Sequence, residues 1–252
     1  MNKIDLTIYK LTNIVNTSDS ESNDTIIAKA LLSLRNEIDQ WTLEEIAKKY
    51  YVSQPSISRF IRKLGFDGFS AFKSALRNST YTVEYVNPVI QKEFKQATDD
   101  IYKDLHQIIE GIKLLKEEDV RDVIKIMMKH ENIYFIGSEL SMAIVRLLQV
   151  KLIALGKNVY TLYKNSYQSE IMKRTTEKDL VIVLSMGQRW YYFLGKEHIN
   201  KKHKENRMLW TVTDEHEDMD YFDEIVMIGN TKDANLGYHY LMQYVMLLYQ
   251  MM

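Results

Sequence analysis

Apolar residues in the first third of the chain recur at helical spacing. Over residues 24–38, 43–50, 57–64 and 69–76 they stand one, three or four positions apart, leaving polar residues outside the stripe. The spacing predicts four amphipathic helices, the first over 24–38 and the last packed through Phe69, Phe72 and Leu76 beneath the middle pair. These helices form a compact all-α module.

Polar residues mark where the middle two helices begin and end. Thr42 and Glu45 have the Ser/Thr-x-x-Glu spacing of a capping box, so a helix should open at Thr42. Ser53 can cap the next helix, because Pro55 two positions later suits its first turn. Gly65 should end that helix.

The second half of the chain has a different pattern, with short continuous apolar runs at 132–136, 159–162, 180–184, 208–212 and 225–228. Helices are expected around 99–115 and 118–130, and longer helical stretches separate the runs. Continuous apolarity suits strands buried on both faces, and alternation with helices implies a parallel sheet. Residues 241–252 read as a packed terminal helix, too short to span a bilayer.

These patterns predict a two-domain α+β chain. A helix-turn-helix domain is expected over residues 1–79, a linker and connecting helix over 80–106, and an α/β domain with a parallel sheet over 107–252.

Charge is balanced over the whole chain but not locally. The 33 basic and 34 acidic residues leave a formal charge of -1, whereas residues 41–80 hold seven basic and three acidic residues, a local charge of +4. Any nucleic-acid footprint must therefore be local. The chain has no cysteine, which excludes disulfides and thiolate chemistry, and its start lacks the apolar core of a signal peptide. We expect a cytoplasmic protein.

The helices that open at Thr42 and Ser53 form the candidate DNA-reading motif. Two short helices joined by a tight turn, the second with polar and basic residues on its free face, fit a major groove about 12 Å wide. The alternative is a cationic helical hairpin that serves only for oligomerisation.

Three segments resemble the MurR/RpiR family of transcription regulators: LEEIA (43–47), SQPSISRF (53–60) and KLGFDGFSAFK (63–73). The resemblance implies contacts to bases or phosphates from the start of the second helix, and contacts to the DNA backbone from the later basic residues. The expected DNA-binding residues are Gln54, Pro55, Ser56, Ser58, Arg59, Arg62, Lys63 and Lys73.

Tyr51 departs from the usual motif. It stands in the turn where helix-turn-helix motifs often carry glycine. If that position needs a positive φ, tyrosine bears a steric cost that glycine avoids.

In this family the DNA-binding module precedes a SIS (sugar isomerase) domain that binds phosphosugars, and the second half resembles one. The matching segments are IYFIGSELS (133–141), KLIALG (151–156), DLVIVLS (179–185) and TVTD (211–214). Hydroxyls at the end of a parallel strand and the start of a helix can hold a phosphate. The resemblance places ligand contacts at Gly137, Ser138, Ser141, Ser185, Gly187, Gln188 and Arg189.

Two departures weaken the expected phosphate cradle. Glu139 replaces the second glycine of the first turn, and LSMGQRW (184–190) lacks most of the family's hydroxyls. Three interpretations stay open: a conventional phosphosugar site, an altered site for another small ligand, and a SIS scaffold kept only for dimerisation. Arg189 could supply a phosphate contact or be a solvated loop residue.

Enzymatic chemistry has little support in the sequence. An isomerase on the same scaffold is the alternative to a sensor, with Glu170 and His239 as conceivable bases. No nucleotide-binding or zinc motif occurs, and the acidic run at 214–220 reads as a solvated loop, so we expect neither a cofactor nor a metal.

The expected protein is a regulator whose partners are a double-stranded DNA operator and a small-molecule effector such as a phosphosugar, and we expect no membrane partner. We expect a homodimer or homotetramer, and a dimer would set two recognition helices about 34 Å apart on a near-palindromic site.

Overall fold

The structure is a computed structural model, and it describes residues 7–77, 93–163, 165–176, 178–186, 206–213 and 221–252. Two compact units divide the chain, Met1–Gln91 and Lys92–Met252. None of the helices within the described ranges is both long and apolar enough to cross a bilayer.

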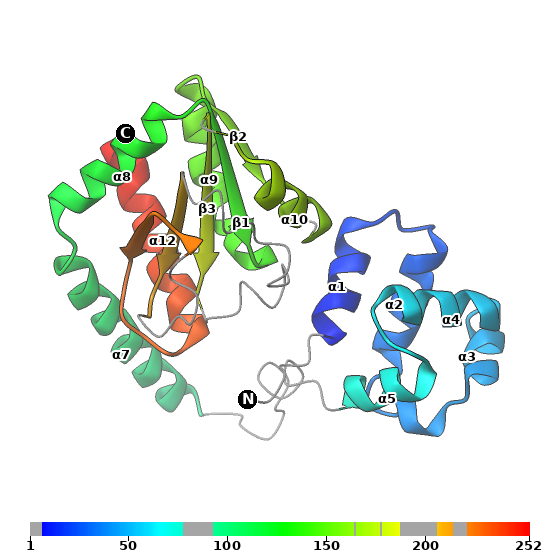
Figure 1. The fold of residues 1–252 in the computed structure, drawn as a ribbon. Helices are drawn as coiled ribbons and strands as arrows, with labels where there is room; N and C mark the ends of the chain where they lie inside the picture. The colour runs from blue at the N-terminus through cyan, green and yellow to red at the C-terminus, as the bar shows by residue number, and fades with distance from the viewer. Residues whose placement is uncertain (1–6, 78–92, 164, 177, 187–205, 214–220) are drawn as a thin grey trace. The chain divides into compact units, whose positions relative to one another are not determined.

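The N-terminal unit is helical throughout its described part (Figure 1). Its elements are α1 (Thr7–Thr17), α2 (Asn23–Ser33), the 3₁₀ turn η1 (Ile38–Gln40), α3 (Leu43–Lys49), α4 (Gln54–Lys63) and α5 (Phe69–Arg77). One apolar core joins all of them, with Leu11, Leu31, Ile46, Ile57 and Phe72 fully buried at its centre.

Two elements of this unit differ from the sequence expectation. Helix α1 was not predicted, yet it buries Ile8 and Leu11 against the core. The helix expected over 24–38 ends earlier: α2 stops at Ser33, and a turn then leads into η1, which buries Ile38. An amphipathic stripe cannot separate a continuous helix from a helix followed by a 3₁₀ turn, because both bury apolar residues about one turn apart.

The C-terminal unit is a layered α/β domain. Helices α7 (Phe94–Lys113) and α8 (Glu117–Lys129) lead into β1 (Asn132–Gly137), α9 (Glu139–Ala154), β2 (Asn158–Thr161) and α10 (Asn165–Arg174). Strands β3 (Asp179–Ser185), β4 (Arg207–Thr211) and β5 (Glu224–Met227) follow, and α12 (Ala234–Met251) ends the unit.

All five strands are parallel, in the order β2-β1-β3-β4-β5. The order reverses between β1 and β3, where Gly137 pairs with Leu184. Ligands of open parallel sheets bind beyond the carboxyl ends of the strands at such a reversal. The topology thus predicts a ligand site at the carboxyl ends of β1 and β3.

Alternate residues of the strands enter two different cores. Phe135, Ile182 and Trp210 pack toward α7, α8, α9 and α12, whereas Val181 and Leu209 pack toward α10 and the segment at Tyr221. Figure 1 shows the helices on both faces of this sheet. The central strands β1, β3 and β4 are buried on both faces, which explains why they read as continuous apolar runs, whereas the edge strands β2 and β5 are partly exposed.

Candidate functional site

The hairpin of α3 and α4 forms the first candidate site. Thr42 caps α3, with its hydroxyl accepting from Glu45 N at 3.2 Å and the Glu45 carboxylate accepting from Thr42 N at 2.7 Å. Ser53 caps α4, and its hydroxyl accepts from Ser56 N at 3.2 Å. Both helices thus begin where the sequence predicts.

Buried apolar contacts fix the two helices against each other. Ile46 of α3 and Ile57 and Ile61 of α4 are fully buried, and Ala47 presents only a methyl group where the helices meet. Gly65 ends the α4 segment with a φ of 93°, the left-handed conformation expected of a C-terminal glycine.

The turn between α3 and α4 passes through a left-handed residue. Tyr51 has a φ of 55°, and Val52 N then donates to Ala47 O at 3.1 Å. The position therefore does need a positive φ, and tyrosine bears the steric cost inferred from the sequence. The Tyr51 side chain is 97% exposed.

The start of α4 presents a connected group of polar side chains. The hydroxyls of Ser53 and Ser56 lie 2.8 Å apart, and the Arg59 guanidinium donates to the Ser56 hydroxyl at 3.2 Å. Gln54, Pro55 and Arg59 are exposed. A free helical face with a positioned arginine near its N-terminus has the composition that major-groove readers use.

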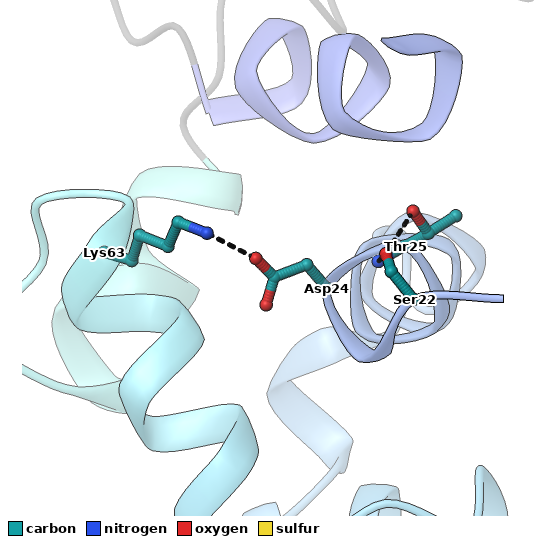
Figure 2. A network of polar contacts seen from close by, with 4 residues as sticks. All are labelled: Ser22, Asp24, Thr25 and Lys63. Atoms are coloured by element: carbon teal, nitrogen blue, oxygen red, sulfur yellow. Dashed lines mark hydrogen bonds and ion pairs between the residues drawn. The ribbon is translucent and has the colours of Figure 1, made fainter. Parts of the chain in front are cut away.

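The predicted backbone contacts Lys63 and Lys73 both have partners within the protein. Lys63 Nζ lies 2.5 Å from Asp24 Oδ2 at the start of α2 (Figure 2). Lys73 Nζ donates to Asp39 O at 3.2 Å and lies over the Phe69 ring. Arg62 is exposed and Ser58 half-buried. A DNA contact by either lysine remains a prediction, and Lys63 would have to exchange its carboxylate partner for a phosphate.

Lys10 is a residue of this unit that the sequence did not single out. Its Nζ donates to Leu64 O at 2.9 Å, at the carboxyl end of α4, and lies over the Phe66 ring at 5.7 Å. A cation there complements the negative end of the helix dipole. The apolar pair Ile8 and Leu11, three residues apart, is the sequence signal for α1, and a helix there would have pointed to Lys10.

The second candidate site lies where β1 ends and α9 begins. Ser138 caps α9, and its hydroxyl accepts from Ser141 N at 3.2 Å. The same hydroxyl lies 3.0 Å from the Ser141 hydroxyl and 3.0 Å from the Tyr238 hydroxyl of α12. Two predicted ligand residues are thus adjacent, and a tyrosine that the sequence did not predict joins them.

Gly137 and Ser185 occupy the ends of the central strands. A Cβ on Gly137 would lie 2.9 Å from Leu184 O, so only glycine fits between β1 and β3. Ser185 is buried, and its hydroxyl has no hydrogen-bond partner among the described residues. A buried hydroxyl without a partner is uncommon and is a place where a ligand could be received.

Gln168 of α10 lies at the same edge of the sheet. Its side-chain amide donates to Gly137 O at 3.0 Å and to Leu162 O, while its Oε1 has no partner within the described parts of the chain. No sequence motif pointed to this residue. Its position beside Gly137 follows only from the topology, which returns α10 to the end of β1.

The remaining predicted ligand residues, Gly187, Gln188 and Arg189, lie outside the described residues, as does the acidic run at 214–220. Glu139 is half-buried in the first turn of α9. Across the ranges that the structure describes, no three His, Cys, Asp or Glu residues cluster as metal ligands would.

Within the part of the chain that the structure describes, no contact brings either conceivable isomerase base into this site. The Glu170 carboxylate pairs with Arg174 at 3.0 Å along α10. His239 is exposed on α12.

Comparison with known proteins identifies the N-terminal unit. Residues 10–82 match the model of the helix-turn-helix domain of the rpiR family. An uncharacterized HTH-type transcriptional regulator of Haemophilus influenzae is 28% identical over 167 residues, which are 63% of this chain and 58% of that protein. The chain thus spans less than two thirds of that relative. A second such regulator, from Thermotoga maritima, is 23% identical over 219 residues, 83% of this chain and 77% of that protein.

Solved structures extend the likeness to the whole fold. The NanR protein of Vibrio vulnificus, solved in complex with ManNAc-6P, has a TM-score of 0.52 at 15% identity, covering 97% of this chain and 90% of NanR. The sugar isomerase domain of an RpiR transcription factor from Sphaerobacter thermophilus covers 62% of this chain and 88% of its own, with a TM-score of 0.47 at 15% identity. The domain match and the curated relatives confirm the resemblance inferred from the sequence for the N-terminal unit: residues 10–82 form a helix-turn-helix domain of the rpiR family, and NanR shares the overall fold.

Proposed function

We propose that this protein regulates transcription by binding double-stranded DNA through α4. The arrangement that carries the proposal is the start of α4, where Ser53, Ser56 and Arg59 form one connected polar face. Arginine is the commonest side chain that reads guanine edges, and serine hydroxyls contact bases or phosphates. The names of the two relatives as transcriptional regulators support the same function.

Substitution of Arg59 tests the DNA interface. A binding site is first selected from a random duplex pool with the wild-type chain. Arg59→Ala should then weaken binding to that site by about 1 to 3 kcal/mol if Arg59 reads a base. Arg121→Ala, on the exposed surface of α8, is the matched control, because it removes an arginine outside the hairpin. Equal binding by wild type and Arg59→Ala would remove Arg59 from the interface.

The α/β domain is proposed to sense a small anionic ligand, with a phosphosugar as the first candidate. Supporting observations are the capping hydroxyl of Ser138 at the positive end of α9 and the buried hydroxyl of Ser185, which has no hydrogen-bond partner among the described residues. NanR, which shares the fold, was solved with a sugar phosphate. The two other interpretations, a different ligand and a scaffold kept for dimerisation, both predict that sugar phosphates do not stabilise the protein.

Thermal denaturation of the full chain with a panel of sugar phosphates tests the phosphosugar proposal against both alternatives. A ligand at 100 times its dissociation constant should stabilise the protein by about 2.7 kcal/mol. Ser185→Ala should reduce that stabilisation, whereas Ser74→Ala on the exposed surface of α5 should not. If no sugar phosphate at millimolar concentration shifts the transition, the phosphosugar proposal fails. A coupled isomerase assay on any ligand found tests the enzyme alternative, and we propose that it shows no turnover.

We further propose that two copies pair through α9. Leu140, Ala143, Leu147, Val150 and Ala154 are all exposed and stand three and four residues apart, the spacing that a second helix fills. A two-fold interface uses the same patch on both copies. Antiparallel pairing would set Glu139 in the first turn against Lys151 in the last turn of the partner.

Val150→Glu tests this pairing because Val150 is 62% exposed, so a carboxylate there costs the single copy little. We expect wild type to sediment as a dimer and the variant as a monomer. Gln243→Glu, on the exposed surface of α12, is the control with the same added charge. A wild-type monomer, or an unchanged dimer of Val150→Glu, would contradict pairing through α9.

A further inference from the structure

Tyr51 combines backbone strain with an absence of packing. Besides Tyr51, the only non-glycine residue with a positive φ among the described residues is Asn206, with a φ of 70°. Asparagine tolerates this conformation because its short polar side chain can bond locally, but tyrosine has no such compensation.

The residues beside Tyr51 do contribute to the fold. The Tyr50 hydroxyl lies 2.6 Å from the Ser33 hydroxyl, and both Tyr50 and Val52 pack against the core of the helical unit. Tyr51 itself is 97% exposed. The unit thus bears the strain of a left-handed tyrosine and gains no burial from its ring. Residues held in strained conformations without a packing benefit cluster at binding sites.

The position of Tyr51 indicates its partner. It stands two residues before Ser53, the N-cap of α4, and so it lies in the turn that leads into the polar face formed by Ser53, Ser56 and Arg59. When the N-terminal residues of a recognition helix enter the major groove, the turn before them lies beside the groove's phosphates. A tyrosine hydroxyl is a common donor to phosphate oxygens.

We infer that Tyr51 contacts the DNA backbone, its ring lying against the sugar-phosphate chain and its hydroxyl donating to a phosphate oxygen. This inference rests on the proposed DNA-binding function of α4. It explains why the turn carries tyrosine rather than glycine: the side chain lowers the stability of the folded protein but strengthens DNA binding. Because the contact is to the backbone, it positions α4 and does not select sequence.

Three variants of the full chain test the inference on the binding site selected with the wild-type chain, with binding followed by fluorescence anisotropy. Tyr51→Phe keeps the backbone and ring but loses the donor, so binding should weaken about tenfold, the loss of a hydrogen bond to a charged group, with an unchanged melting temperature. Tyr51→Gly should bind as weakly or more weakly, yet melt at a higher temperature, because glycine relieves the strain. Arg59→Ala serves as the reference for the α4 interface.

Salt dependence separates the two kinds of contact. A neutral hydroxyl displaces no counterion, so Tyr51→Phe should keep the wild-type slope of log K against log salt. Arg59→Ala should make that slope shallower by about 0.9 if the Arg59 guanidinium neutralises a phosphate. If both Tyr51 variants bind like wild type while Arg59→Ala is weakened, the Tyr51 contact is wrong and the α4 interface stands. If all three variants bind like wild type, the proposed DNA contact of α4 is wrong, and so is the inferred contact of Tyr51.

Discussion

Lys63 on α4 donates to Asp24 on α2, with 2.5 Å between Nζ and Oδ2. Both side chains keep contact with solvent, so the pair contributes at most about 1 kcal/mol to stability. Its position is more informative than its strength. The Asp24 carboxylate pairs with the Lys63 ammonium group, which the sequence analysis expects to contact the DNA backbone. Asp24 and a DNA phosphate would therefore compete for Lys63.

Replacing Asp24 with asparagine should strengthen DNA binding. The change releases Lys63 and removes a negative charge close to α4. We expect the affinity for a mixed-sequence duplex to rise, and the slope of log K against log salt to steepen by up to about 0.9, the value for one added phosphate contact. Anisotropy titrations at several salt concentrations measure both quantities.

The double variant shows whether Lys63 mediates the effect. Lys63→Ala alone should weaken binding, and adding Asp24→Asn to it should restore little. If Asp24→Asn strengthens binding equally with and without Lys63, then removal of the negative charge accounts for the gain, and competition for Lys63 is wrong.

Ser22, beside this ion pair, caps α2 and lends itself to a stability test. Its hydroxyl accepts from Thr25 N at 3.1 Å and lies 2.9 Å from the Thr25 hydroxyl (Figure 2). Ser22→Ala leaves that backbone N–H without its acceptor and should lower the free energy of unfolding by about 1 kcal/mol. Ser22→Asp keeps an acceptor and should stay close to wild type in urea denaturation. Equal losses in both variants would show that the cap is not the cause.

Local chemistry made the start of α3, the start of α4 and the strands predictable. Thr42, Ser53, Pro55 and Gly65 act within one or two turns of their own position, so their spacing carries the information. The central strands β1, β3 and β4 are buried on both faces, and the apolar runs predict all five strands to within a residue or two at either end.

Contacts between distant parts of the chain were not predictable. Asp24 and Lys63 are 39 residues apart, and Ser138 and Tyr238 are 100 residues apart. Nothing in the spacing near Lys63 shows that a carboxylate from α2 will meet it. Gln168 reaches Gly137 only because the fold brings α10 to the end of β1. The sequence therefore named several members of each candidate site but not the partners that occupy or complete them.

Asp179, at the start of β3, should make the α/β domain sensitive to acid. Burial raises the pKa of its carboxyl group, but hydrogen bonds from Thr176 and Asn132 outweigh that effect and hold the pKa below its usual value. A pKa that is lower in the folded protein contributes stability above the unfolded pKa of about 3.9, and this stability is lost as the pH falls through the folded pKa.

The pH dependence of Asp179→Asn checks this contribution. The variant should unfold at lower urea than wild type at neutral pH, because asparagine cannot accept all three hydrogen bonds. The gap between the two proteins should narrow as the pH falls below about 4. Asp122→Asn, on the exposed surface of α8, is the control. A gap that stays constant with pH would mean that the Asp179 charge does not stabilise the fold.

Gly237 sets how closely α12 approaches the end of β3. A Cβ at this position would lie 2.8 Å from Met186 O and 3.1 Å from a methyl group of Val212. The nearest atom belongs to the backbone and cannot rotate away, so Gly237→Ala should push the start of α12 outward and destabilise the domain by about 1–3 kcal/mol. Tyr238 follows directly, and its hydrogen bond to Ser138 should lengthen with that shift. We therefore expect weaker stabilisation by any bound sugar phosphate as well as a lower melting temperature.

Gly68→Ala is the matched control, since a Cβ there meets nothing within 4 Å. A Gly237→Ala protein that melts and binds like the control would show that the close approach of α12 is not required at the ligand site.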